Sequence, residues 1–347
     1  MFVSLRKFAA AADGIVPGCT VWLTGSASVE DYREGWSEDY REGWSDLDLL
    51  VLTEEDLTPD RAEKLLVLRQ AMADREPGNP YYSRIEGVAV SADGYGTGKN
   101  CLSVYWGTTG QRIEEGCRAD VFTLAAMDRW ILLHGRDVRN RLEKPSPGML
   151  YDAVKKHAGT IREHGTSTKT PMYRCGWMLD MARCLYTLKT GRVISKTGAG
   201  KTALRLGWCP DETALRDALA VRCDPKNEER HIPDSAILGF LAVLEEELAR
   251  PMVTDPCYCG HDCGRCMVRC GDPRAAEFYR DEMGIFLNRE ELHCSGGRSD
   301  SVMALCGGCP MRSCCRKKGI QSCIDCEEPC RTYLDYAEKY VNRMGQV

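Results

Sequence analysis

Two short apolar segments near the N-terminus, each bordered by polar residues, most constrain how this chain folds. Residues 21–23 run into Thr24-Gly25-Ser26, and residues 47–51 follow Asp46 and contain Asp48. Because successive side chains of a strand point to opposite faces, the two carboxylates share one face. They repel each other unless a divalent cation lies between them, and Mg²⁺ binds carboxylates together with substrate phosphates.

The Gly25-Ser26 turn adds a place for a phosphate. Glycine lets the backbone approach a phosphate closely, while a serine hydroxyl and neighbouring N–H groups can hold its oxygens. A phosphate-binding turn beside paired carboxylates is typical of nucleotidyl transfer.

Together these residues resemble the DNA polymerase β-type nucleotidyltransferase superfamily, whose pattern is an apolar strand, Gly-(Gly/Ser) and then Asp-x-(Asp/Glu). The resemblance implies an α+β fold whose first domain, over residues 1–143, is the nucleotidyltransferase α/β domain. It also implies that ATP is the co-substrate and that Gly25 and Ser26 bind its phosphates.

The same resemblance implies three carboxylates that hold two Mg²⁺ ions. Asp46 and Asp48 are the first two, and the third lies on a later strand in the family. The candidate here is Asp120, which is followed by a short apolar run and would also take the acceptor proton. Glu114 and Glu115 are alternative bases.

An exact tandem repeat lies between the two motifs. Residues 30–37 and 38–45 have the same sequence, so the spacer is 19 residues long, and one copy would leave 11. We interpret the extra copy as a surface loop, because lengthening a loop costs little closure entropy. In the alternative interpretation this loop, with Tyr40 and Trp44, overhangs the active site and alters or impairs it.

The apolar spacing changes in the middle of the chain. Residues 144–148 are rich in proline and are expected to be a linker, and residues 149–250 are expected to form a helical domain. One helix is predicted over residues 173–190 with Gly191 as its C-cap, and another is predicted to begin near Asp234.

The sequence from Arg183 to Lys196 resembles the helical domain of streptomycin/spectinomycin-type aminoglycoside adenylyltransferases. There an arginine on the helix and a lysine beyond a Thr-Gly turn contact the triphosphate of ATP, which implies these roles for Arg183 and Lys196. Such cations would neutralise phosphate charge as the cleft closes. The family's acidic antibiotic-binding residue corresponds to Tyr173 here, and Asp180 lies further along. The acceptor therefore stays open between an aminoglycoside, another antibiotic, a nucleotide and a protein hydroxyl.

Composition excludes several classes of partner. The net charge of −5 over 347 residues argues against non-specific nucleic-acid binding, which needs a basic surface. No apolar run approaches the roughly 18 residues that span a membrane, and the N-terminus lacks the layout of a signal peptide. We therefore expect a cytoplasmic protein.

Thirteen of the 20 cysteines lie within residues 257–330 and include three C-x₂-C pairs. Such pairs are typical of tetrahedral thiolate sites, and disulfides are rare in the cytoplasm. Structural Zn²⁺ is therefore the preferred interpretation, with an iron–sulfur cluster and disulfides or free thiols as alternatives. His261 or His293 could replace a thiolate. The expected ligands are Cys257, Cys259, Cys263, Cys266, Cys306, Cys309, Cys314, Cys323, Cys326 and Cys330.

Residues 255–347, which we call the cysteine-rich tail, resemble a compact cysteine-rich domain family of unknown function. The marks are the Tyr-Cys-Gly-His-Asp-Cys run from Tyr258, the Cys-Ser-Gly-Gly-Arg run from Cys294, and the Cys-x₂-Cys-Pro run from Cys306. The resemblance implies a third, metal-stapled domain and no particular activity. A lid, a partner-docking module and a redox sensor are all compatible with it.

Two functions follow from the sequence. In the first, the chain moves AMP from ATP onto a hydroxyl of a small molecule, such as an aminoglycoside antibiotic, and so confers resistance. In the second, the enlarged loop has silenced the transferase, and the tail acts as a metal-binding sensor or docks a protein partner. The intact aspartates favour the first, because a silenced site has no reason to keep a costly cluster of like charges.

Overall fold

The computed structural model describes residues 1–28, 45–107, 110–117, 119–224 and 230–338. All of the tandem repeat except Ser45 lies outside these residues. The chain divides into two compact units, one built mainly of Met1–Met149 and the other mainly of the residues from Leu150 onward. Within the described residues, no helix is long and apolar enough to cross a membrane.

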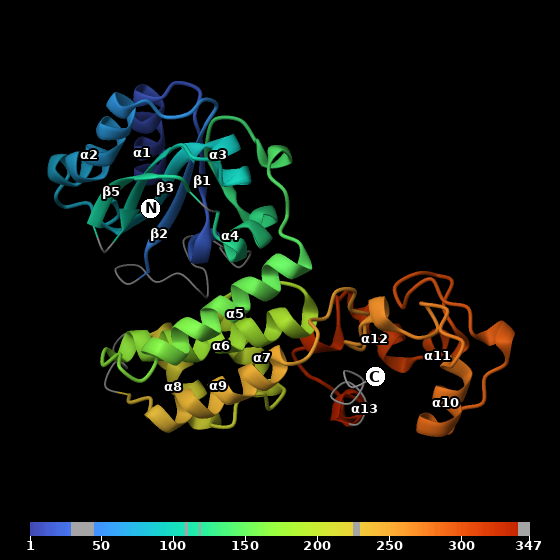
Figure 1. The fold of residues 1–347 in the computed structure, drawn as a ribbon. Helices are drawn as coiled ribbons and strands as arrows, with labels where there is room; N and C mark the ends of the chain where they lie inside the picture. Colours follow the sequence, from blue (N-terminus) through green and yellow to red (C-terminus); the bar gives the residue numbers. More distant parts are fainter. Residues whose placement is uncertain (29–44, 108–109, 118, 225–229, 339–347) are drawn as a thin grey trace. The chain divides into compact units, whose positions relative to one another are not determined.

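The first unit is a mixed sheet with helices on both faces (Figure 1). Six strands of the described chain pair in the order β5-β4-β3-β2-β1-β6. The elements are α1 (Phe2–Ile15), β1 (Thr20–Leu23), η1 (Gly25–Ser28), β2 (Leu47–Thr53), α2 (Pro59–Arg75), η2 (Tyr82–Arg84), β3 (Ile85–Ser91), α3 (Ala92–Thr97), β4 (Leu102–Gly107), β5 (Gly110–Glu115), α4 (Val121–Ala125), η3 (Met127–Arg129), β6 (Ile131–His134) and η4 (Arg139–Arg141).

Strand β2 lies inside this sheet, antiparallel to β1 and parallel to β3. Its side chains alternate between two apolar clusters, as the sequence predicted. Leu47 and Leu49 are buried in the cluster that includes residues of α1 and α2, whereas Leu50 and Leu52 belong to the cluster that includes residues of α3 and α4. The two strands predicted around the Gly-Ser turn and the aspartates are therefore confirmed.

Helices follow the sheet. They are α5 (Pro147–His164), α6 (Pro171–Thr190), α7 (Lys196–Arg205), α8 (Glu212–Cys223) and α9 (Asp234–Leu248). Helix α6 packs against α7 and α9 and ends at Gly191, whose φ of 66° is the left-handed conformation that favours glycine at a C-cap. The predicted helices ending at Gly191 and beginning at Asp234 are confirmed.

The prediction of a linker over residues 144–148 is wrong at its C-terminal end, because α5 begins at Pro147. Proline fits the first turn of a helix, where its missing N–H leaves no intrahelical partner unsatisfied.

The cysteine-rich tail consists of short helices and turns. They are η6 (Cys263–Arg265), α10 (Ala275–Met283), η7 (Arg289–Glu291), α11 (Ala304–Gly307), α12 (Pro310–Lys318), η8 (Cys323–Asp325) and α13 (Arg331–Tyr336). A small apolar cluster around Val268, Tyr279 and Met303 is buried within it.

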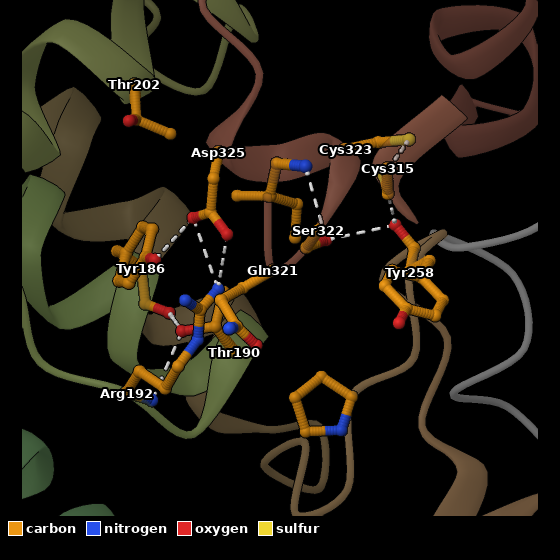
Figure 2. A network of polar contacts seen from close by, with 12 residues as sticks. Tyr186, Thr190, Arg192, Thr202, Tyr258, Cys315, Gln321, Ser322, Cys323 and Asp325 are labelled. Atoms are coloured by element: carbon orange, nitrogen blue, oxygen red, sulfur yellow. Dashed lines mark hydrogen bonds and ion pairs between the residues drawn. The ribbon is translucent and has the colours of Figure 1, made fainter. Parts of the chain in front are cut away.

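The tail contacts the helices of the second unit through η8, as Figure 2 shows. Asp325 accepts a hydrogen bond from the Tyr186 hydroxyl at 2.6 Å and pairs with the Arg192 guanidinium at 2.8 Å. Next to it, the carbonyl of Ile324 accepts a hydrogen bond from Arg205 at 2.6 Å. These bonds join α6, α7 and the turn after α6 to the tail.

Candidate active site

Asp46 and Asp48 lie at the start of β2. Asp46 directly precedes the strand and Asp48 is its second residue, and both aspartates are half-buried. Leu47, between them, and Leu49, after Asp48, are buried. This alternation places the two carboxylates on one face, opposite the apolar cluster of α1 and α2. The expected shared face is thus present.

The Gly25 turn is fixed directly against Asp48. The N–H of Thr24 donates to the Asp48 carbonyl at 2.8 Å, and its hydroxyl donates to the same oxygen at 3.2 Å. Gly25 has a φ of 64°, and a Cβ at this position would overlap the Asp48 carboxylate. Glycine is therefore required here for two reasons, its backbone conformation and its closeness to a carboxylate. Ser26 lies in the same turn, η1, and is half-buried.

A third carboxylate, missed in the sequence, stands beside the pair. Strand β3 runs parallel to β2 in a register that places Glu86 opposite Asp48. Glu86 is half-buried, and its negative charge acts on Asp46. The signal available in the sequence was weak: a single acidic residue, Glu86, at the start of a strand that is otherwise apolar or small.

The electrostatics of Asp46 reflect this cluster. Burial raises the pKa of its carboxyl, the charge of Glu86 raises it further, and the guanidinium groups of Arg84 and Arg69 oppose the rise. The Asp46 Oδ1 atom is buried and has no hydrogen-bond partner within the described part of the chain. A buried carboxylate oxygen without a donor is costly, and a bound cation would relieve that cost.

Asp120 is placed differently from the expectation. The apolar residues after it form the short helix α4, so the predicted strand is wrong. Asp120 is the N-cap of this helix, and its Oδ1 accepts hydrogen bonds from the Thr123 N–H at 2.7 Å and from the Thr123 hydroxyl at 2.8 Å. N-capping by aspartate accounts for this local structure. The alternative bases Glu114 and Glu115 lie on β5, one of the two edge strands in the described sheet, and Glu114 pairs with Arg112.

The structure brings Arg183 and Lys196 together within the second unit, around a residue that the sequence did not single out for this role. Asp180 is 4 % exposed, and its carboxylate pairs with Arg183 at 2.8 Å, with Lys196 at 2.9 Å and with the His157 imidazole at 3.4 Å. Burial alone would raise the pKa of Asp180. The charges of Lys196 and Arg183 and the contact with His157 outweigh burial and hold this pKa well below its usual range. Tyr173, at the expected antibiotic position, is exposed on α6.

The three C-x₂-C pairs of the tail form tight turns. In each, the N–H of the second cysteine donates to the carbonyl of the first, at 3.3 Å for Cys263 and Cys266, 3.3 Å for Cys306 and Cys309, and 3.1 Å for Cys323 and Cys326. Such turns are the backbone form expected of thiolate knuckles.

Two further pairs of sulfur atoms, neither within one C-x₂-C turn, lie close together. Cys257 and Cys259 lie 3.0 Å apart, and the buried Cys315 and Cys323 lie 3.4 Å apart (Figure 2). In the part of the chain that the structure describes, no three His, Cys, Asp or Glu side chains are grouped so as to hold a metal ion. The described part of the tail therefore supplies the turns but no assembled three-ligand group, and zinc binding stays a prediction.

The aspartate pair is compatible with Mg²⁺ binding, which has a different ligand requirement. This ion is held by one or two protein carboxylates together with substrate phosphates and water, so three protein ligands are not required. The half-buried Asp46 and Asp48, the orphaned Asp46 Oδ1 and the glycine turn fit such a site.

Two comparisons with known proteins found a similarity. Residues 256–335 match a family described as "Protein of unknown function (DUF3795)", which agrees with the resemblance of the tail to a cysteine-rich family. No curated protein matches the chain. One similar solved structure is that of spectinomycin adenyltransferase AAD(9) from Enterococcus faecialis with ATP and spectinomycin. It has 15 % sequence identity and a TM-score of 0.48, and the match covers 72 % of this chain and 100 % of that chain.

Proposed function

We propose that this chain is a Mg²⁺-dependent nucleotidyltransferase that moves AMP from ATP onto a hydroxyl of a small molecule. One observation carries the proposal: Asp46, Asp48 and Glu86 stand together beside the Gly25 turn. Like charges on neighbouring strands are destabilising, so a cluster of this kind needs a functional reason.

Asp46 and Asp48 would hold Mg²⁺, which when bound stabilises the charge on the phosphates and on the leaving pyrophosphate. The turn that contains Gly25 and Ser26 would bind phosphate oxygens through its N–H groups and the serine hydroxyl. The two hydrogen bonds from Thr24 to the Asp48 carbonyl hold this turn against the strand, so phosphate and cation would be positioned together.

Glu86 would take the proton from the acceptor hydroxyl. The sequence assigned this role to Asp120, but one oxygen of Asp120 already accepts two hydrogen bonds as a helix cap. Glu86 instead lies opposite Asp48 and close enough to Asp46 to act on its charge. A general base has to be within reach of the proton that it removes, which favours the carboxylate beside the pair.

Arg183 and Lys196 would neutralise the ATP triphosphate. Both pair with the single carboxylate of Asp180, so these three side chains on α6 and at the start of α7 keep a net positive charge that a triphosphate can neutralise. The acceptor is a hydroxylated small molecule, and an aminoglycoside is the first acceptor to test because the helical sequence resembles that family.

The test is Mg²⁺-dependent pyrophosphate release from ATP across a panel of aminoglycosides and other hydroxylated small molecules. Asp46→Asn and Glu86→Gln are expected to lower the rate on the order of 10³-fold, since each removes a group that acts on the reacting atoms. Asp120→Asn is the matched control and is expected to retain most of the activity, with its effect confined to the stability of α4.

Near wild-type rates for Asp46→Asn would end the two-carboxylate proposal. Loss of activity in Asp120→Asn together with full activity in Glu86→Gln would assign the role of general base to Asp120 instead of Glu86. If the wild-type chain does not bind ATP even with Mg²⁺ present, the silenced transferase becomes the better account.

A further inference from the structure

A cavity of about 560 Å³ lies inside the second unit, between its helices and the cysteine-rich tail. Leu206 and Trp208, which follow α7, line it on the helical side, and His261, Tyr279 and Tyr333 line it on the tail side. The volume falls within the roughly 300–1,000 Å³ of small-molecule sites. The described residues of its wall run from Lys189 to Glu338, and the site around Asp46 is built from other residues.

The lysine and arginine side chains on the wall of this cavity are paired within the protein. Each of its four described lysine and arginine side chains has a carboxylate within 3.6 Å. The pairs are Lys189 with Glu247 at 2.7 Å, Arg250 with Glu246 at 2.6 Å, Arg265 with Asp262 at 3.6 Å, and Arg274 with Asp272 at 2.8 Å. An anionic ligand would have to compete with these internal partners, and a neutral ligand would not.

Four aromatic side chains besides His261 line the described wall. Trp208 and Phe278 are half-buried, and Tyr279 and Tyr333 are buried. Flat aromatic ligands pack well against such faces, in stacked or edge-to-face contact.

Among the described residues of the wall, one buried polar atom has no hydrogen-bond partner. The Nε2 atom of His261 is buried and has no hydrogen-bond partner among the described residues. Leaving such an atom unsatisfied is costly, and a hydrogen bond to a ligand would recover that cost.

We propose that this cavity binds a neutral, flat aromatic small molecule with one hydrogen-bonding group, which packs against the aromatic wall and bonds to His261. A ligand at this place touches both the helices and the tail. Its binding therefore stabilises the contact that Asp325 makes with Tyr186 and Arg192. The inference is independent of the proposed transferase activity, because its readouts are binding and stability.

The test uses the full-length chain and two probes of the same ring system, neutral 1-naphthol and anionic 1-naphthalenesulfonate, measured by calorimetry. The neutral probe is expected to bind at a single saturable site and to raise the melting temperature. The sulfonate is expected to bind at least about tenfold more weakly, because the cations of the wall are already paired.

Substitutions locate the site. Ala337→Trp places a large side chain on the wall of the cavity and is expected to weaken 1-naphthol binding more than tenfold. Ala304→Trp, at the exposed start of α11 and outside the wall, is the matched control and is expected to bind as wild type does. His261→Phe keeps an aromatic ring but removes the hydrogen bond, and is expected to weaken binding roughly tenfold.

Three results would overturn the proposal. The first is equal affinity for the two probes, and the second is equal binding by the two tryptophan variants. The third is unchanged probe affinity in His261→Phe together with loss of bound zinc, which would make His261 a metal ligand. If Ala337→Trp fails to fold, the two probes and His261→Phe still decide the matter.

Discussion

Gly25→Ala is the substitution that most directly probes the proposed active site. The glycine has a φ of 64°, and an added Cβ would overlap the carboxylate of Asp48. Alanine therefore meets two separate penalties, an unfavourable backbone conformation and a displaced carboxylate.

The two penalties can be separated in magnitude. The left-handed conformation costs about 1–2 kcal/mol for a residue with a Cβ. Forcing an extra carbon into an occupied space costs typically about 1–3 kcal/mol more. Gly18 is the matched control, because its φ of 82° is also left-handed but a Cβ there would meet no atom within 4 Å. Gly18→Ala is therefore expected to carry only the first cost, and Gly25→Ala both.

The assays are urea unfolding of both variants and Mg²⁺-dependent pyrophosphate release. We expect Gly25→Ala to be less stable than Gly18→Ala by about 1–3 kcal/mol. We also expect it to lose on the order of 10²-fold in rate, because a catalytic carboxylate displaced by about 1 Å costs that much. Equal destabilisation by the two substitutions, or a Gly25→Ala variant as active as Gly18→Ala, would refute the argument.

Three other predictions concern the second unit. Because the pKa of Asp180 is held below its unfolded value of 3.8, its ion pairs stabilise the fold above that pH and are lost as the pH falls below it. Asp180→Asn should therefore lower the free energy of unfolding, measured with urea at pH 7, by about 3 kcal/mol. It should also weaken the loss of stability between neutral and acidic pH, and an unchanged pH dependence in the acid range would contradict this. Tyr186→Phe removes the hydrogen bond to Asp325 and should speed amide hydrogen exchange in η8 without altering exchange in α9. Equal exchange in η8 of the variant and of the wild type would contradict this. If the three tight turns of the tail hold zinc, elemental analysis of protein purified without oxygen should give about two equivalents of zinc. Chelation should then unfold the tail while nucleotide binding stays nearly unchanged. Iron with acid-labile sulfide, or a metal-free folded tail, would refute zinc binding.

The sequence by itself determined those features that depend on neighbouring residues. Alternation in the segment of Leu47 and Leu49 set β2 and the shared face of its two aspartates, because strand periodicity is a local property. Gly191 ended α6, since a left-handed C-cap depends on one residue. The tight turns at the C-x₂-C pairs of the tail have the same local origin.

Only the tertiary structure decided which distant residues complete each site. Glu86 stands beside Asp48 because β3 adds to β2 in one particular parallel register, and a shift of one residue would turn it to the other face. The outcome at Asp120 is a local exception: its hydrogen bonds to Thr123 make it a helix cap and outweighed the weak strand pattern after it. Asp180 collects its cations from α6 and α7, and the cavity joins residues more than a hundred positions apart. Pairing of this kind depends on how whole elements pack, and the energy of packing is spread over many residues instead of residing in any one motif.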